Sequence, residues 1–250
     1  MSLSPIPKVL STFHRRRVRA LLMGGQACIL YGATEFTRDV DFAVAVAPGN
    51  LGKLRAALDE LEAEPVSFPP LSAAVLARGH ACHFRCLGAY LNNVRVDVMS
   101  KMRGVDPFEK LWKRREVIRL PGVGRLSVLA LPDLVRAKKT QRDKDWPMVR
   151  RLVEADIARA TSEPRQARVA FWLRECRTFE LLRDLGQQYP RLARKEAVRR
   201  PALRAALKGD AARTAVLLRQ EEDRERELDR RYWAPLKKEL ERWRLGRDGG

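Results

Sequence analysis

Two short stretches decide the fold of this 250-residue chain: Leu22–Ala27, which reads LMGGQA, and Thr37–Phe42, which reads TRDVDF. The first ends an apolar strand at Gly24 and Gly25, where a helix can begin. A glycine pair of this kind leaves backbone N–H groups open to phosphate oxygens. The second stretch alternates polar and apolar residues, which is typical of a strand. We therefore expect a strand, a glycine turn, a short helix and a second strand.

Asp39 and Asp41 stand two positions apart on the expected strand Asp39–Val46, so both carboxylates are predicted to share one face. Adjacent carboxylates repel each other unless a cation lies between them, and hard oxygen ligands suit Mg²⁺. A third carboxylate, Asp97, stands between valines on the expected strand Val94–Met99. The three aspartates predict a site for two Mg²⁺ ions, where an attacking hydroxyl displaces pyrophosphate from a nucleoside triphosphate.

The expected elements change in character near residue 130. Before it, short strands and helices mix, including a hairpin with strands His83–Leu87 and Val94–Met99. From Pro132 onward the pattern is almost entirely helical, and we expect four prolines to break it: Pro147, Pro164, Pro190 and Pro201. We predict an α/β (α+β) protein with a small mixed sheet flanked by helices. Its expected parts are a lead-in over 1–18, a core over 19–130 and a helical C-terminal region over 131–250.

The chain is strongly basic, with 50 Lys and Arg against 31 Asp and Glu and a net charge of +19. Such an excess favours a polyanionic partner such as RNA, DNA or a nucleotide, or else an acidic surface. Residues 110–151 hold 13 basic against 4 acidic residues, whereas residues 151–250 hold 25 against 17 with the signs interleaved. Interleaving is typical of a solvated helix. We therefore expect residues 110–151 to be the better candidate for phosphate contacts.

Several classes of protein are disfavoured by composition. The sequence contains no run of 18 apolar residues, so we expect no membrane partner, and residues 1–8 show no secretory signal. Four cysteines do not make a disulfide scaffold, so we expect reduced thiols and a cytoplasmic location. His80, Cys82, His83 and Cys86 lie close together, but their spacing fits no familiar structural zinc site, and we favour packing roles for them.

The order Gly24-Gly25, a spacer of 13 residues, Asp39-Val40-Asp41 and a later Asp97 resembles the polymerase-β-like nucleotidyltransferase superfamily. With Ala27, Tyr31-Gly32 and Thr37 added, the pattern is similar to the bacterial minimal nucleotidyltransferases, including the AbiEii-like toxins. The resemblance covers about residues 19–155. It implies transfer of a nucleoside monophosphate from an NTP to an acceptor hydroxyl, with Gly24, Gly25, Thr37 and Arg38 at the nucleotide.

A second block, Asp133–Asp145, is similar to the helical Lys…Arg-x-Lys-Asp motif that follows the catalytic core in that toxin-like group. The resemblance implies that Lys138 holds the triphosphate and that Asp145 supports it, with Lys139 as the rival lysine. The same resemblance implies a toxin-like role and an antitoxin partner.

Three functions stay open on the sequence. The first is a Mg²⁺-dependent nucleotidyltransferase whose leading acceptor is RNA, for example tRNA, with a protein side chain as the next candidate. The second is a catalytically inactive module on the same fold that binds RNA or a partner, with salt-dependent binding that is indifferent to Mg²⁺. The third is a small-molecule (antibiotic) adenylyltransferase. The charge of +19 disfavours it, because cationic acceptors would be repelled.

Overall fold

The structure is a computed structural model, which describes residues 5–33, 37–66, 68–91, 93–160 and 163–246. The chain divides into two compact units. The first unit comprises Met1–Leu30, Thr34–Ala137 and Tyr232–Gly250, and the second comprises Tyr31–Ala33 and Lys138–Arg231.

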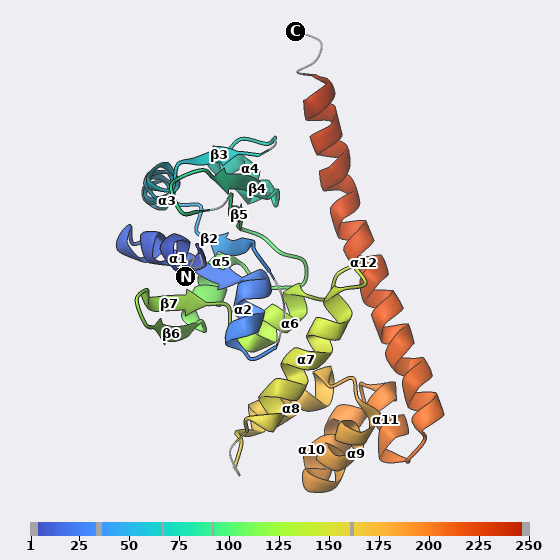
Figure 1. Cartoon of the computed structure of the whole chain (residues 1–250). Coiled ribbons are helices and arrows are strands. Elements are labelled where there is room, and N and C mark those ends of the chain that lie inside the picture. Colours follow the sequence, from blue (N-terminus) through green and yellow to red (C-terminus); the bar gives the residue numbers. More distant parts are fainter. Residues whose placement is uncertain (1–4, 34–36, 67, 92, 161–162, 247–250) are drawn as a thin grey trace. The chain divides into compact units, whose positions relative to one another are not determined.

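A mixed sheet forms the centre of the first unit (Figure 1). In the described part of the chain it has seven strands, in the order β3 (Ala63–Pro65), β4 (Cys82–Cys86), β5 (Arg95–Met99), β2 (Val40–Val44), β1 (Ala20–Met23), β7 (Gly124–Val128) and β6 (Glu116–Leu120). The pairs β2–β5 and β1–β7 are parallel, and the other neighbours are antiparallel. The expected mixed sheet is confirmed.

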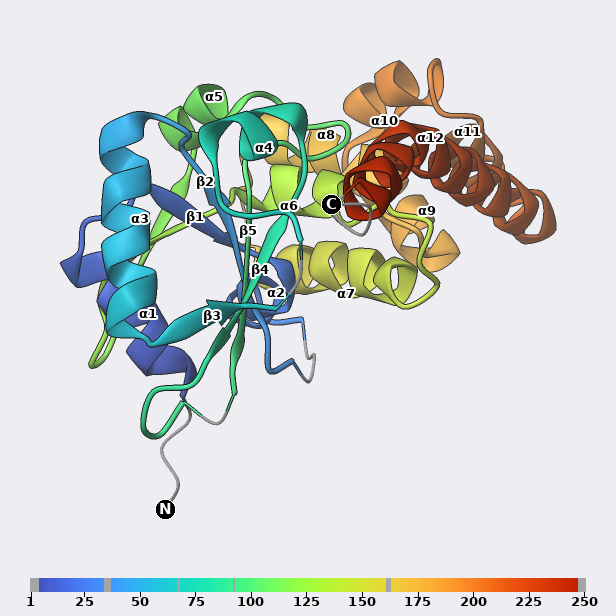
Figure 2. The ribbon, with the colours of Figure 1, turned by 90° about the horizontal axis from the view of Figure 1, so that it is seen from above.

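Helices lie on both faces of this sheet (Figures 1 and 2). Helices α1 (Ile6–Arg15) and α3 (Pro48–Glu60) lie on one face, and α2 (Gly24–Leu30) and α6 (Leu131–Ala137) lie on the other. Phe13 of α1 stacks on Phe42 of β2, with ring centroids 4.2 Å apart. Because side chains alternate along a strand, the neighbouring Asp41 must point to the opposite face, on the side of α2. The fold thereby directs one predicted acid toward the glycine turn.

The expected strand Asp39–Val46 is shorter in the structure, since β2 spans only Val40–Val44. Asp39 therefore lies just outside the strand, which corrects its predicted position. The backbone N–H of Asp39 donates to Oγ1 of Thr37 at 3.3 Å. This N–H therefore forms a local hydrogen bond with the preceding loop and not with a neighbouring strand. Its carboxylate is exposed, whereas that of Asp41 is half-buried.

The end of the longest helix belongs to the first unit, not to the second. Helix α12 spans Ala211–Leu245, and its last part packs on the end of α4 (Ala73–Arg78). Glu239 accepts a hydrogen bond from Arg78 at 2.8 Å and lies 2.8 Å from Nε2 of the buried His80. The ring of Trp243 lies 4.9 Å from that of His80. A carboxylate and an aromatic ring thus cover a histidine about 160 residues earlier in the chain.

The second unit is helical, as expected for this part of the chain. It contains α7 (Asp145–Ala158), α8 (Gln166–Glu175), α9 (Phe179–Gln188), α10 (Pro190–Ala197), α11 (Pro201–Leu207) and the first part of α12. The helices are separated near all four prolines, as expected: Pro147 lies in the first turn of α7, Pro164 lies between α7 and α8, and Pro190 and Pro201 begin helices. The missing N–H of proline costs nothing in a first turn, where no carbonyl pairs with it.

Across the described residues, no helix has the length and apolar character needed to cross a bilayer. The four cysteines, Cys28, Cys82, Cys86 and Cys176, are all buried free thiols. Burial raises the pKa of Cys82 and of Cys86 to about 11, which keeps both thiols protonated at neutral pH.

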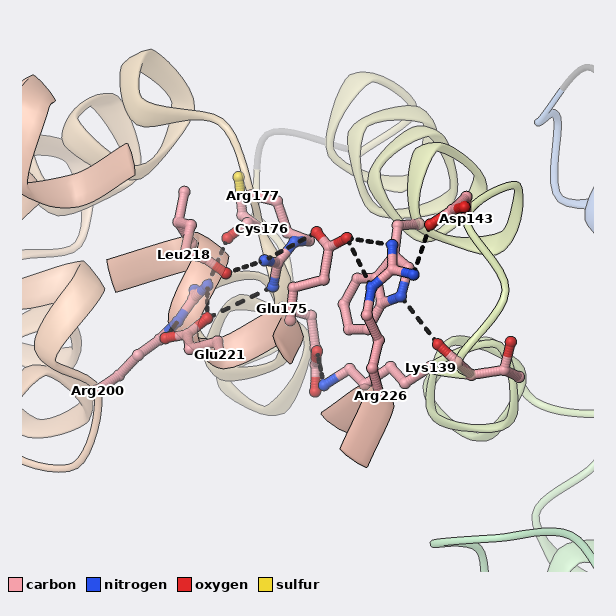
Figure 3. A network of polar contacts seen from close by, with 12 residues as sticks. Lys139, Asp143, Glu175, Cys176, Arg177, Arg200, Leu218, Glu221 and Arg226 are labelled. Atoms are coloured by element: carbon pink, nitrogen blue, oxygen red, sulfur yellow. Dashed lines mark hydrogen bonds and ion pairs between the residues drawn. The ribbon is translucent and has the colours of Figure 1, made fainter. Parts of the chain in front are cut away.

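A buried arginine, Arg200, ties the helices of the second unit together (Figure 3). Its guanidinium donates to the carbonyl oxygens of Leu173 and Cys176, each at 2.8 Å, at the end of α8. It also pairs with Glu221 of α12 through two bonds of 3.0 Å. Because carbonyls at a helix end have no partner within the helix, this guanidinium supplies what the backbone lacks. One side chain therefore joins α8 and α12 to the start of α11.

We expect Arg200→Met to lower the free energy of unfolding by about 3 kcal/mol, because two buried carbonyls and Glu221 lose their donor together. Arg199→Met, at the exposed neighbouring position, is the matched control and is expected to change stability by less than about 0.5 kcal/mol. Urea unfolding followed by tryptophan fluorescence measures both. Equal losses in the two variants would contradict the anchoring role of Arg200.

Candidate functional site

A row of four aligned residues crosses the sheet of the first unit. Met23, Asp41, Asp97 and His83 are successive Cα partners on β1, β2, β5 and β4. Partners directly opposite each other point to the same face of a sheet. Asp41 and Asp97 are therefore neighbours on parallel strands and face the side of α2. The structure brings two of the three predicted acids together in this way.

Arg95 is a cation in direct contact with Asp97. It stands two residues before Asp97 on β5, and its Nε donates to Oδ1 of Asp97 at 2.7 Å. This hydrogen bond is the main cause that raises the pKa of Arg95, against the lowering effect of burial. The charges of Asp97, Asp39 and Asp41 raise it further. The charges of all three predicted carboxylates therefore stabilise the protonated guanidinium of Arg95.

His83 holds Asp97 from the other side. Its Nδ1 lies 2.8 Å from Oδ1 of Asp97 and 2.9 Å from Nη2 of Arg95. One ring nitrogen cannot donate to the carboxylate and accept from the guanidinium at once, and an ionised carboxylate favours the tautomer with a proton on Nδ1. Burial alone would raise the pKa of Asp97, but the hydrogen bonds from His83 and Arg95 outweigh it and lower this pKa. Asp97 is therefore held ionised at neutral pH.

The glycine turn makes room for the acid and for the loop before it. A Cβ placed on Gly24 would overlap Oδ2 of Asp41, and Gly24 has a φ of +65°. A Cβ on Gly25 would lie 2.6 Å from Cγ2 of Thr37. Gln26 also donates to the carbonyl of Thr37 at 3.2 Å. Both glycines are therefore required by close approach, and Gly24 by its backbone conformation as well.

The remaining predicted residues lie elsewhere. Arg38 is exposed on the loop before β2. In the second unit, Nζ of the buried Lys138 lies 3.3 Å from Oδ1 of Asp145, and Lys139 pairs with Glu175 at 2.5 Å. The predicted partnership of Lys138 with Asp145 is present as a buried ion pair. A role for either lysine toward a triphosphate stays a prediction.

Carboxylate oxygens are the ligands that Mg²⁺ prefers, and Asp41 and Asp97 share one face of the sheet, with Gly24 packed against Asp41. These two residues are of the right type to hold one divalent ion, and binding of Mg²⁺ there stays a prediction. Among the residues that the structure describes, no three His, Cys, Asp or Glu side chains form a group able to hold a metal ion. Asp39, Asp41 and Asp97 therefore do not form the predicted three-residue metal group.

Sequence reasoning missed His83, which belongs to the row, and Arg95, which lies beside it. It considered His83 only with the cysteines and did not consider Arg95. The signal was present, because Arg95 is two residues from Asp97 and must share its face. The hairpin register then places His83 opposite Asp97. Without the register, the alternation alone does not say which residue of β4 faces the acid.

We expect Gly24→Ala to destabilise the protein by about 1–2 kcal/mol or more, because an alanine at positive φ is strained and its Cβ overlaps Asp41. Gly49→Ala is the matched control, because it lies in helix α3 with no atom within 4 Å of an added Cβ. No loss is expected there, since alanine favours helix over glycine. Urea unfolding compares the two, and a tolerated alanine at position 24 would contradict the close approach.

The buried carboxylate of Asp145 is expected to make stability depend on pH. Burial would raise its pKa, but the charge of Lys138 and hydrogen bonds from Thr140 and Arg142 lower the pKa overall. A lowered folded-state pKa stabilises the fold above the unfolded-state pKa, and this contribution is lost as pH falls through the folded-state value.

Asp145→Asn should therefore lower the free energy of unfolding at pH 7 by about 3 kcal/mol, since it leaves the buried Lys138 without an ionised partner. The difference from the wild type should narrow as the pH falls through the lowered pKa of Asp145, where the carboxylate of the wild type also becomes protonated. Urea titrations across this range give the comparison. A difference that stays constant with pH would contradict the ion pair.

Comparison with known proteins finds two solved structures with a distant similarity to this chain. No protein-family model and no curated protein matches this chain. A solved structure from H. pylori, described as a "putative nucleotidyltransferase", is 12% identical with a TM-score of 0.40, and the match covers 88% of this chain and 92% of that one. JHP933 from Helicobacter pylori has the same identity and TM-score, and its match covers 93% of this chain and 95% of that one.

Proposed function

We propose that this protein is a Mg²⁺-dependent nucleotidyltransferase that moves a nucleoside monophosphate from an NTP to an acceptor hydroxyl. The observation that carries the proposal is the placement of Asp41 and Asp97 side by side on parallel strands, next to a glycine turn that a side chain would block. Two neighbouring carboxylates beside a glycine turn are what a divalent cation and a triphosphate require together.

In this proposal the residues of the row and of the glycine turn have different roles. Asp41 and Asp97 hold the cation, which when bound neutralises phosphate charge and orients the triphosphate for in-line attack. The lowered pKa of Asp97 suits a metal ligand, because a weak base keeps its charge. Gly24 and Gly25 offer backbone N–H groups to phosphate oxygens in this proposal, beside Asp41 and Thr37, which lie against them. Asp39, exposed just before β2, is the third predicted acid and would reach the cation only if the loop before β2 moves.

RNA is the acceptor that we favour, because a chain with a net charge of +19 attracts polyanions at long range. A protein side chain is the second choice. The toxin-like role and the antitoxin partner are expectations from the resemblance alone, whereas tRNA is one RNA that the basic charge would attract. A cationic antibiotic is disfavoured for the same electrostatic reason that favours RNA.

One observation favours an inactive binding module as the second candidate. Arg95 and His83 both engage Oδ1 of Asp97, so this oxygen already has partners without a metal ion. If that arrangement is permanent, the row is a structural ion-pair cluster and the protein binds RNA without turnover. The activity of variants separates the two functions.

We expect the protein to transfer label from at least one NTP to total RNA in the presence of Mg²⁺ and to lose this activity with EDTA. Asp41→Asn should reduce the rate about a thousand-fold, because loss of a metal ligand removes several kcal/mol of transition-state stabilisation. Asp59→Asn, on the exposed face of α3, is the charge-matched control and should keep full activity. The readout is labelled RNA on a denaturing gel.

If Asp41→Asn labels RNA as well as the wild type does, the catalytic proposal is wrong. If no NTP labels RNA or protein while RNA still binds independently of Mg²⁺, the inactive module is supported instead.

A further inference from the structure

A dense group of exposed positive charges lies on two short helices of the second unit. Residues 190–208, which contain α10 and α11, hold seven Lys and Arg against one acidic residue. Six of the seven side chains are exposed, and we call them the α10–α11 surface: Arg191, Arg194, Lys195, Arg199, Arg204 and Lys208. The seventh, Arg200, is buried. Every exposed charge of this segment except that of Glu196 is therefore positive.

These six cations have no carboxylate partner. Glu196 lies 3.7 Å from Arg174 instead, and within the described residues none of the six forms an ion pair. Residues 110–151 differ, because at least six of their 13 cations pair with carboxylates: Lys110, Arg114, Lys138, Lys139, Arg142 and Arg150. An ion pair removes much of a cation's attraction for a distant phosphate. The segment that the sequence favoured is thus partly neutralised, and α10–α11 is not.

Part of this surface is shaped as an open groove. Arg194, Arg204 and Lys208 line it together with Ala197, Val198 and Leu207. Arg204 donates to the carbonyls of Ala197 and Val198 at 3.3 and 3.1 Å, at the end of α10. Arg194 donates to the carbonyl of Pro190 at 3.2 Å. Two guanidinium groups are therefore held in place before any ligand binds, so these side chains lose less conformational entropy on binding.

We propose that the α10–α11 surface binds the phosphate backbone of a nucleic acid, and of RNA in particular. Guanidinium forks match phosphate oxygens, and arginine supplies four of the six cations. Residues 190–208 contain no Phe, Tyr or Trp, so base stacking is absent and the contact is to the backbone. The inference deepens the proposed function, on which the choice of RNA rests, since it names the surface that holds the acceptor.

The test measures binding, without NTP or Mg²⁺, of the full-length protein to a fluorescein-labelled RNA duplex. Lys195→Gln, Arg199→Gln and Lys208→Gln are combined in one variant, since no hydrogen bond or ion pair of these side chains is disturbed. The matched control combines Lys113→Gln, Arg119→Gln and Arg125→Gln, which removes the same charge from exposed positions between residues 110 and 151. Thermal unfolding confirms that both variants fold.

We expect the α10–α11 variant to bind RNA at least about ten-fold more weakly, and the slope of log affinity against log salt to fall by about 3. The control should stay close to the wild type. Similar losses in both variants would overturn the proposal, since total charge would then explain binding. Binding of an acidic peptide but not of RNA would overturn it in favour of a protein partner.

A DNA duplex of the same sequence forms the second arm. Binding of RNA as tightly as DNA, or more tightly, supports a backbone site for an RNA acceptor, whereas binding of DNA alone overturns the choice of RNA. Transfer is scored separately with labelled NTP. RNA binding that depends on α10–α11 without any transfer would defeat the proposed function and leave this surface intact. If both transfer and RNA binding are unchanged in the α10–α11 variant, the role of this surface is overturned and the proposed function stands.

Discussion

The close approach of Asp41 to Gly24 is the constraint on which the candidate site depends. Phe42 packs on Phe13 on one face of the sheet, so the preceding residue has to point to the other face. There it meets a backbone that carries no side chain at residue 24. Sheet alternation and glycine geometry therefore place one carboxylate against one turn. The parallel pairing of β2 with β5 then sets Asp97 beside it.

The electrostatics of the row follow from this placement. Two carboxylates on neighbouring strands repel each other, and Arg95 offsets that repulsion from the same face. His83 completes the arrangement from β4. In an enzyme, such a cluster would exchange its internal cation for an external one when substrate arrives. In a binding module, the same cluster would only stabilise the sheet. The two functions thus differ in the occupant of the acids and not in the fold.

Alternation predicted the central strands, and the glycine pair predicted the turn, because both signals are local. Asp39 was placed wrongly in the strand, since a two-residue period does not reveal where hydrogen bonding begins. The prolines predicted the breaks between helices correctly, because each of Pro190 and Pro201 begins a new helix after a break. Charge counting favoured residues 110–151 because it counts cations along the chain and ignores their partners. Lys139, for example, pairs with Glu175, which is 36 residues away in the sequence.

The chain leaves the first unit at Ala137 and returns to it at Tyr232, so the second unit is an insertion rather than an appendage. The returning helix brings Glu239 to His80 and Arg78. A shortened protein that stops at residue 137 would therefore expose an imidazole that is otherwise 1% exposed, and would remove its acceptor. The first unit therefore keeps its cover over His80 only where the final turns of α12 are retained.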